Sequence, residues 1–579
     1  MEHYRDQREL DPDDPFDDPE ELWTPEKIAA EEEEDKRSAR WSNRATLEHG
    51  KSEISVKANN LPSIINQIDE ILVKMDVPIY QRGGALVRIG ETSITKSKSG
   101  IEFVNIVADD LVVLLSRYIT WTRYDGRQKQ LVNINCPLGV AKAYLSQRGA
   151  WKLPTVHAII TAPTLRSDGS ILDQPSLDPA TGIYYDPRGV DFPSIPIRPT
   201  LADARGALDK MIELVREVPF VREDDGTSVS RSVFLSAILT ALFRPALPAA
   251  PMHTFSAPTA GSGKSMLVSA IAILATGEPP CVLAQGFTEE ETEKRLATVL
   301  RAGDQVVSFD NCTRPLEGEL LCQAITEPTL SIRILGKSER TRIANTSFYA
   351  ATGNNLVVAG DMVRRTLRCV IDAEAESPEN RTFRTERPDR LAASQRADFV
   401  VAGLTVLRAF FVAGCPQTQT PLGSLEEWSR SVREALIWLG EPDPCRSIDG
   451  IRQEDPERMK VANVLREWHS VCGPGPIRVQ DLIDAALVMT EWQAGQQSKP
   501  RNPGLRDALV AVADNGIGKL NKQAVANWIA RQKNKIIDGY KVIEAGKLNG
   551  YPRWRVIAPD EPTSKQGDNL SWIDRQLFE

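Results

Sequence analysis

A glycine-rich loop at residues 257–265 constrains this chain of 579 residues more than any other segment. The loop reads Ala-Pro-Thr-Ala-Gly-Ser-Gly-Lys-Ser, and it lies between an apolar run at 252–256 and a helix-like stretch at 266–275. A strand, a glycine loop and a helix in this order predict a phosphate-binding loop, or P-loop. The backbone N–H groups of such a loop form an anion site, and the N-terminus of the helix adds its partial positive charge.

The loop also supplies side chains suited to a nucleotide and its metal. Lys264 can reach phosphate oxygens, and the hydroxyl of Ser265 can bind Mg²⁺. The usual pattern has glycine where this chain has Pro258, but two later glycines stand where the backbone comes closest to the ligand. A turn that only caps a core helix is the alternative, although it leaves the Gly-Lys-Ser triplet unexplained. We expect ATP to be bound by six consecutive residues: Gly261, Ser262, Gly263, Lys264, Ser265 and Met266.

A second apolar strand, at 306–310, ends in Asp310, far enough after the loop for one strand and one helix to intervene. In P-loop folds a carboxylate at this place lies beside Mg²⁺. Asn311 follows, at a position where many ATPases have the glutamate that activates water. An amide can orient water but cannot accept its proton. Glu327, another acid or polarisation by the metal must therefore serve instead.

A third apolar strand, at 346–352, leads into Gly353 and Asn354. A polar residue at the tip of a strand beside the P-loop strand can contact the γ-phosphate of ATP and position water. Asn354 is therefore a candidate sensor of the γ-phosphate, and an ordinary Gly-Asn turn is the alternative.

Three arginines follow this strand, at Arg364, Arg365 and Arg368. An exposed arginine just before a strand can enter the site of a neighbouring subunit and neutralise charge in the transition state, as arginine fingers do. The alternative is an ordinary ion pair with Glu374 or Glu376.

Together these motifs resemble the helicase core of superfamily III. Members of this superfamily are hexameric AAA+ motors of viruses, phages and mobile elements, and they are often fused to a primase. The resemblance implies a Mg-ATP site formed by Lys264, Ser265 and Asp310, with Ser265 and Asp310 at the metal. It also implies that Asn354 is the sensor and that Arg365 is the arginine finger.

The resemblance further implies a DNA-contacting β-hairpin just before the sensor strand. Residues 332–344 can form this hairpin, with Lys337 and Arg340 near its tip as DNA-binding residues. The resemblance covers 250–375 and extends more loosely to other segments, at 162–169, 427–429 and 438–444.

Charge is distributed unevenly along the chain, although the net charge is only −9. Residues 1–35 contain 16 Asp and Glu, whereas residues 499–555 contain 12 Lys and Arg against four acids. A basic C-terminal region is compatible with nucleic-acid binding.

The cysteines and the hydropathy pattern indicate a cytosolic protein. The eight cysteines form no Cys-x-x-Cys pair, which fits reduced thiols better than disulfides or zinc. No apolar stretch approaches the roughly 18–20 residues of a membrane span. We therefore expect a cytoplasmic protein with no membrane partner, and the resemblance to phage and mobile-element helicases implies the cytoplasm of a bacterial host.

We expect an α/β fold built around a P-loop, AAA+-like core with flanking helices. The expected order is an acidic disordered tail (1–50), a mixed α+β N-terminal domain (51–200), a helical linker or collar (201–249), the ATPase core (250–375), a helical segment (376–455), a winged-helix-like DNA-binding domain (456–558) and a C-terminal tail (559–579).

The expected function is that of a ring-forming, ATP-dependent DNA helicase in the replication of a phage or mobile element. Its partners would be single-stranded DNA in the channel, duplex DNA at the C-terminal domain, further copies in a homo-hexamer, and a primase or polymerase. Asp109 and Asp110 are adjacent rather than spaced as in polymerases, so a primase activity of its own is not expected. The alternatives are an AAA+ initiator or loader that does not unwind, and a non-enzymatic DNA-binding replication adaptor.

Overall fold

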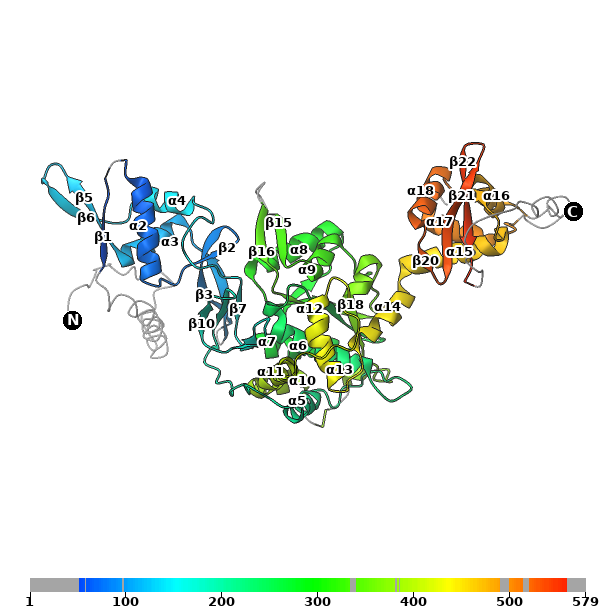
Figure 1. Cartoon of the computed structure of the whole chain (residues 1–579), viewed down its shortest axis with the longest axis horizontal. Coiled ribbons are helices and arrows are strands. Elements are labelled where there is room, and N and C mark those ends of the chain that lie inside the picture. The colour runs from blue at the N-terminus through cyan, green and yellow to red at the C-terminus, as the bar shows by residue number, and fades with distance from the viewer. Residues whose placement is uncertain are drawn as a thin grey trace, which may run out of the picture.

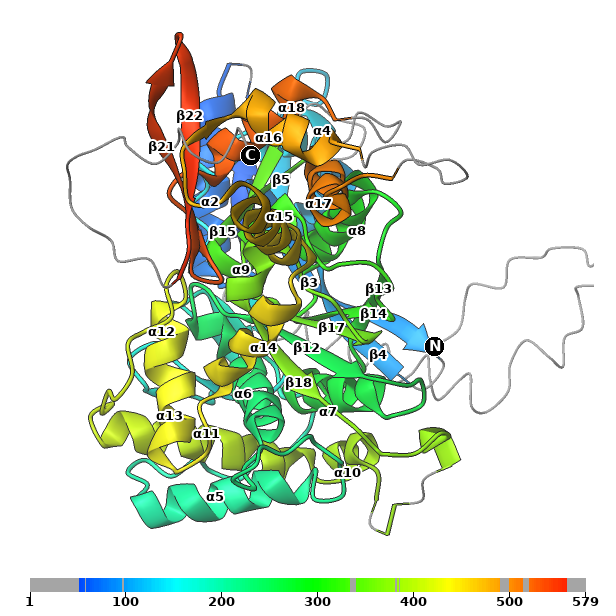
Figure 2. The same cartoon turned by 90° about the vertical axis from the view of Figure 1, so that its right-hand side faces the viewer.

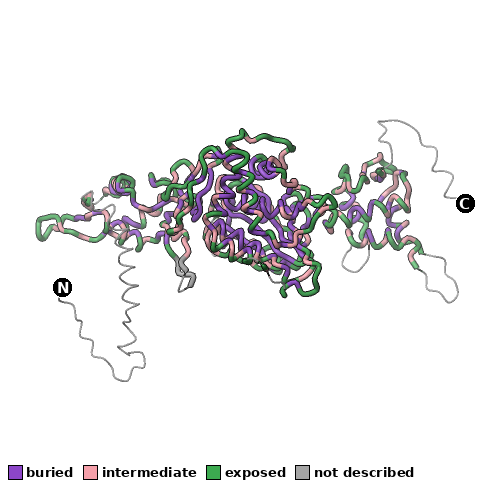
Figure 3. Tube along the Cα trace, turned by 90° about the horizontal axis from the view of Figure 1, so that it is seen from below, coloured by how far each residue is buried: buried purple, intermediate pink, exposed green. Residues whose placement is uncertain are grey.

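Three folded parts follow one another along the longest axis of the molecule (Figure 1). The computed structural model describes residues 51–57, 59–95, 98–333, 340–380, 383–384, 386–489, 499–513 and 520–559. The expected acidic tail, nearly all of the C-terminal tail, and Lys337 lie outside these ranges. Buried residues are concentrated in the central part, which is the largest of the three (Figure 3).

The N-terminal part combines helices with two small sheets of order β1-β5-β6 and β2-β3-β4. Its first helix buries Ile64, Ile68 and Leu72, whose spacing of four places them on one face. The elements are β1 (Ser52–Ser55), α2 (Leu61–Lys74), β2 (Tyr80–Arg82), β3 (Ala85–Thr95), β4 (Lys98–Asn105), α3 (Ala108–Tyr118), β5 (Ile119–Asp125), β6 (Gln130–Ile134) and α4 (Leu138–Leu145).

The segment after residue 157 packs on the central part. The hydroxyl of Thr164 donates to Leu242 O at 2.7 Å, and Arg408 donates to Gly169 O at 2.8 Å. The largest hydrophobic cluster of the N-terminal part spans residues 54–153, and Leu177 and Tyr184 of the later segment pack against Tyr80 and Val87, so this segment contacts both parts. This segment contains β7 (Ala158–Ile160), β8 (Thr164–Leu165), β9 (Ile171–Leu172), β10 (Ser176–Asp178) and β11 (Ile183–Tyr185).

A parallel sheet of order β13-β14-β17-β12-β18 forms the centre of the molecule (Figure 2). Alternate residues of β17 face opposite layers: Phe348 and Ala350 join one core cluster, Tyr349 and Ala351 the other. The strands are β12 (Met252–Ala257), β13 (Cys281–Ala284), β14 (Val306–Asp310), β17 (Phe348–Asn354) and β18 (Thr366–Val370). Helices α6 (Val229–Phe243) and α7 (Lys264–Thr276) cover one face, and α8 (Glu289–Ala302) and α9 (Glu319–Thr326) cover the other.

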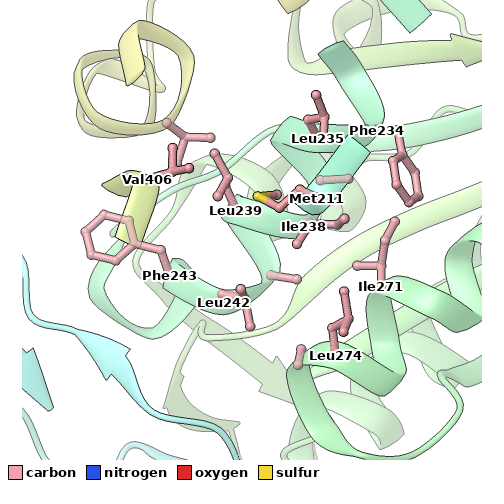
Figure 4. Packing of buried hydrophobic residues seen from close by; sticks show 14 of the residues in the cluster. Met211, Phe234, Leu235, Ile238, Leu239, Leu242, Phe243, Ile271, Leu274 and Val406 are labelled. Carbon is pink, nitrogen blue, oxygen red and sulfur yellow. The ribbon is translucent and has the colours of Figure 1, made fainter. Parts of the chain in front are cut away.

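Helix α6 is enclosed by other elements on nearly all sides. Every residue of α6 except Arg231 is buried, and its side chains pack against α5 (Leu201–Glu213), α7 and α11 (Arg396–Val412) (Figure 4). The stretch Val229–Ala246 is long and apolar enough to cross a membrane by length and composition, which the sequence analysis did not anticipate. In the folded protein 83% of this stretch is buried, as in the core helix of a folded domain.

The helices on either side of the sheet belong to the same hydrophobic core as the sheet. Residues from 204–250 and from 392–448 join one cluster with the sheet, so the expected collar and helical segment have no separate cores. The remaining elements here are η1 (Arg244–Ala246), η2 (Gly360–Arg365), η3 (Pro378–Asn380), α10 (Pro388–Ser394), α12 (Glu426–Trp428), η4 (Ser429–Arg433), α13 (Glu434–Trp438), η5 (Pro444–Arg446) and α14 (Ser447–Glu454).

The C-terminal part has its own core, in which helices pack on a sheet of order β19-β22-β21-β20. Asn549 and Gly550 both have positive φ angles, of 51° and 81°, and they connect the two long strands in a tight turn. The elements are α15 (Pro456–Cys472), β19 (Ile477–Arg478), α16 (Val479–Leu487), α17 (Pro503–Ala513), α18 (Lys522–Gln532), β20 (Ile536–Ile537), β21 (Tyr540–Leu548) and β22 (Tyr551–Ile557).

The N-terminal part is held on the central part by the β2–β3 turn. Arg82 donates to the last carbonyls of α8, at 2.6 Å to Arg301 O and 3.2 Å to Leu300 O. The hydroxyl of Thr341 donates to Gly83 O at 2.7 Å. Thr341 belongs to the antiparallel hairpin of β15 (Thr329–Arg333) and β16 (Arg340–Ala344), so the turn contacts that hairpin directly.

The two turn glycines provide a matched test of this contact. Both have positive φ, so Ala at either position costs about 1–2 kcal/mol of backbone strain. A Cβ on Gly83 would also lie 2.9 Å from Thr341 Oγ1 and 3.1 Å from Arg342 O, whereas a Cβ on Gly84 meets nothing within 4 Å. We expect Gly83→Ala to lower the melting temperature more than Gly84→Ala and to speed tryptic cleavage between residues 146 and 157. Equal effects of the two substitutions would contradict this docking contact.

Candidate active site

The glycine loop connects β12 to α7 at the carboxyl edge of the central sheet. Gly261 and Gly263 have φ angles of 74° and 99°, in the left-handed region that favours glycine. A Cβ on Gly261 would lie 2.8 Å from Glu379 Oε2 and 3.2 Å from the backbone nitrogen of Glu379. Both the backbone conformation and the lack of space therefore require glycine at Gly261.

The ammonium group of Lys264, the first residue of α7, lies within the loop. It donates to Thr259 O at 2.9 Å, to Ser262 Oγ at 3.0 Å and to Asn354 Oδ1 at 2.8 Å. Burial lowers the pKa of Lys264, and the nearby carboxylate of Asp310 partly opposes this effect. The loop therefore fixes one positive charge at the N-terminus of a helix.

The carboxylate of Asp310 faces this charge from the end of β14. Its Oδ1 accepts hydrogen bonds from Ser265 Oγ at 2.9 Å and from Thr352 Oγ1 at 2.6 Å. The hydroxyl of Thr352 in turn accepts from Asn311 N at 3.0 Å. A hydroxyl and a carboxylate side by side are oxygen ligands of the kind that Mg²⁺ prefers.

The strand order explains how these groups meet. Strand β17 lies between β12 and β14, with Asn354 opposite Ala257 and Ala351 opposite Phe309. Residues two apart in a strand project to the same side. Thr352 can therefore reach the carboxylate of Asp310 on β14, while Asn354 reaches Lys264 in the loop that follows β12.

Thr352 was missed by the sequence analysis. It is buried, and it is the side chain that holds the carboxylate of Asp310 from the side of β17. The sequence did contain a signal for Thr352, namely its position two residues before Asn354. Side chains two residues apart in a strand point to the same side, so this position places Thr352 beside Asn354.

The geometry does not support Glu327 as the group that activates water. Its carbonyl accepts from Asn345 Nδ2 at 2.8 Å, and Asn345 precedes the first residue of β17. The seven residues of β17 span about 20 Å, at roughly 3.3 Å per residue. Glu327 therefore lies at the opposite edge of the sheet. Besides Asp310, the structure brings Glu379 against the loop, where it contacts the position of Gly261.

The three arginines differ in their environment. The side chain of Arg365 is 11% exposed and lies 2.9 Å from Asp361, whereas that of Arg364 is 48% exposed and pairs with the same carboxylate at 2.6 Å. Arg368 pairs with Glu454 instead. The observed partners are thus different acids from those considered in the sequence analysis. Arg364, rather than Arg365, has the exposure that contact with another subunit requires.

The expected DNA hairpin is only partly described. Strands β15 and β16 pair in antiparallel register, with Arg333 opposite Arg340. Arg340 is exposed, and the tip that contains Lys337 lies outside the described residues.

The chain matches no family model, and no curated protein is similar enough in sequence to match it. Solved structures give weak overlaps. The C-terminal region of NrS-1 in its A form has a TM-score of 0.32 at 12% identity, covering 74% of this chain and 91% of that one. The SCCmec type IV protein Cch, described as an active helicase, has a TM-score of 0.30 at 10% identity, covering 83% and 97%.

A structure of the JCV helicase with a bound small molecule has a TM-score of 0.19 at 14% identity, covering 47% of this chain and 70% of that one. Two of these three proteins are named as helicases. TM-scores this low do not show that the present chain has the activity of any of these proteins.

Proposed function

We propose that this chain is an ATP-dependent DNA helicase with a motor of the superfamily III, AAA+ type. The observation that carries the proposal is the meeting of Lys264, Ser265, Asp310 and Asn354 at one edge of the parallel sheet. A fixed ammonium group, a helix N-terminus and a carboxylate–hydroxyl pair are the groups that a metal-bound triphosphate needs. Motors of this type are driven by hydrolysis of a metal-bound nucleoside triphosphate.

Each side chain of the site has a proposed role. Lys264 would exchange its present oxygen acceptors for phosphate oxygens, and the loop amides would hold the remaining phosphate charge. Ser265 and Asp310 would hold Mg²⁺, which neutralises charge on the phosphates. Asn354, already hydrogen-bonded to Lys264, would contact the γ-phosphate and orient water. Thr352 would keep the carboxylate of Asp310 facing the metal.

The motor would act as a homo-hexameric ring. The exposed guanidinium of Arg364 supports a role as arginine finger better than that of Arg365, whose side chain is buried in its own subunit. Single-stranded DNA would pass the β15–β16 hairpin, to which Arg340 contributes an exposed charge.

The C-terminal part would bind duplex DNA through α18 and the β21–β22 hairpin. Lys522, Asn527 and Arg531 are exposed on that helix. The ammonium group of Lys522 lies 5.7 Å from the centre of the Tyr551 ring, at the end of the hairpin. This contact joins helix and hairpin into one surface with polar and cationic groups. The proposed setting is replication of a phage or mobile element in a bacterial cytoplasm, beside a primase or polymerase.

The proposal is tested first by removing the two charges of the site. Lys264→Ala and Asp310→Ala should each lower ATP turnover by roughly 10²–10³-fold, the loss typical of groups that stabilise charge in a transition state. Both should also abolish unwinding of a forked duplex. Glu327→Gln is the matched control, because that carboxylate lies at the opposite edge of the sheet and should leave turnover near wild type.

Near-normal turnover in the Lys264 variant would contradict the nucleotide site. Turnover without strand displacement by the unmodified chain would instead favour an initiator or loader.

The role of Thr352 is tested by a pair of substitutions of similar size. Thr352→Val removes the donor to Asp310 and the acceptor for Asn311 N, whereas Thr352→Ser keeps both. Each of the two hydrogen bonds lost is worth about 1 kcal/mol. We therefore expect Thr352→Val to need several-fold more Mg²⁺ for half-maximal ATP turnover, and Thr352→Ser to behave as wild type. The same Mg²⁺ requirement in both variants, with both folded, would argue that the hydroxyl has no role at the metal.

The assignment of the arginine finger is tested by comparing variants of the two adjacent arginines, Arg364 and Arg365. Arg364→Ala protein should bind ATP but barely hydrolyse it. Mixing it with Lys264→Ala protein should restore activity, because an intact Lys264 site then meets an intact Arg364. Arg365→Ala should chiefly lower the melting temperature, since Arg365 pairs within its own subunit. If mixing rescues the Arg365 variant and not the Arg364 variant, the assignment based on exposure is wrong.

A further inference from the structure

We propose that the β5–β6 hairpin of the N-terminal part is a second binding site, specific for single-stranded DNA. The hairpin forms the end of the molecule farthest from the C-terminal part, and it projects away from the central sheet (Figure 1). Its outer half is exposed (Figure 3). The site would therefore remain accessible when nucleotide or DNA is bound to the central part.

An exposed pair of side chains forms a flat apolar surface on one face of the hairpin. Tyr124 and Leu131 are directly opposite each other in the antiparallel register. Tyr124 is 60% exposed and Leu131 is 53% exposed. An aromatic ring on such a ribbon offers a stacking surface for an unpaired base, whatever its identity.

Arg127 and Lys129 lie in the turn beside this surface, and Arg123 lies on the opposite face of the hairpin. Arg123, Arg127 and Lys129 are all exposed, and among the described residues none of them has an acidic partner within ion-pair distance. The one acid of the hairpin, Asp125, accepts from the backbone of Arg127 at 2.7 Å and from that of Gln128 at 3.3 Å. The carboxylate thus shapes the turn, while the cations are available to phosphates.

The base of the hairpin is held in place by packing, strand pairing and hydrogen bonds, which favours a surface that is formed before binding. The side chain of Trp121 is 1% exposed and donates to Leu115 O at 3.4 Å. The hydroxyl of Thr122 donates to Glu53 Oε1 at 3.0 Å, and β1 pairs with β5 in parallel. A preorganised surface loses less conformational entropy when it binds.

Single-stranded DNA fits these features better than the other anionic partners. The bases of a duplex are stacked on one another, so Tyr124 would have no free base to stack on. A membrane surface attracts cations too, but binding to it grows with buried apolar area. One Tyr–Leu pair on a narrow ribbon supplies little of that area.

The test uses the full chain without nucleotide and a fluorescently labelled oligothymidylate. Tyr124→Ala should weaken binding about tenfold, within the range for loss of one base-stacking side chain. Tyr124→Phe keeps the ring and should bind as wild type. Arg127→Ala with Lys129→Ala should lower the slope of log affinity against log salt by about 0.7 per lost phosphate contact. Lys142→Ala, which removes an exposed cation from α4, is the matched charge control.

Photocrosslinking of a halogenated oligonucleotide should label the peptide that contains Tyr124, which separates this site from any in the motor. Basal ATP turnover should be unchanged in all these variants, so a failure here is distinguishable from a failure of the proposed motor. Wild-type affinity in Tyr124→Ala, with no crosslink to the hairpin, would overturn the proposal. So would an equal loss of duplex affinity, or loss of binding to anionic phosphatidylserine vesicles while oligothymidylate binding stays intact.

Discussion

The insertion of β17 between β12 and β14 is the constraint on which the candidate site depends. Parallel pairing to both neighbours places the tip of this strand between Lys264, in the loop that follows β12, and the carboxylate of Asp310 at the end of β14. Thr352 and Asn354 lie on the same side of that tip and hydrogen-bond to Asp310 and Lys264, at 2.6 and 2.8 Å. A shift of β17 by one residue would turn both side chains away and separate the two charged groups.

The P-loop helix is fixed at its other end by a buried cation. The guanidinium of Arg396 donates to Leu274 O at 3.2 Å, to Ala275 O at 3.3 Å and to Thr161 O at 3.1 Å. A positive charge at the C-terminus of a helix is favoured by the helix dipole. Burial lowers the pKa of Arg396 to about 10, so the group remains charged at neutral pH. This contact ties α7 and α11 to the segment after residue 157.

The sequence predicted what depends on local pattern and missed what depends on strand order and packing. Lys264 and Asp310 were identifiable because a glycine loop and a strand-ending carboxylate are short-range signals. Thr352 was not, since its role appears only when β17 is known to lie beside β14. The burial of Arg365 likewise depends on tertiary packing, which a run of two arginines does not reveal. The position of Glu327 at the far edge of the sheet required the course of the chain between α9 and β17.

The central claim is that a metal-bound triphosphate occupies the carboxyl edge of the sheet, between the loop and the tip of β17. A structure of the chain with Mg²⁺ and a non-hydrolysable ATP analogue tests it most directly. The account expects phosphate oxygens within hydrogen-bonding distance of Lys264 Nζ, the metal beside Ser265 Oγ and Asp310, and Asn354 turned toward the γ-phosphate. A nucleotide bound elsewhere, or a metal held without Ser265 and Asp310, would contradict it.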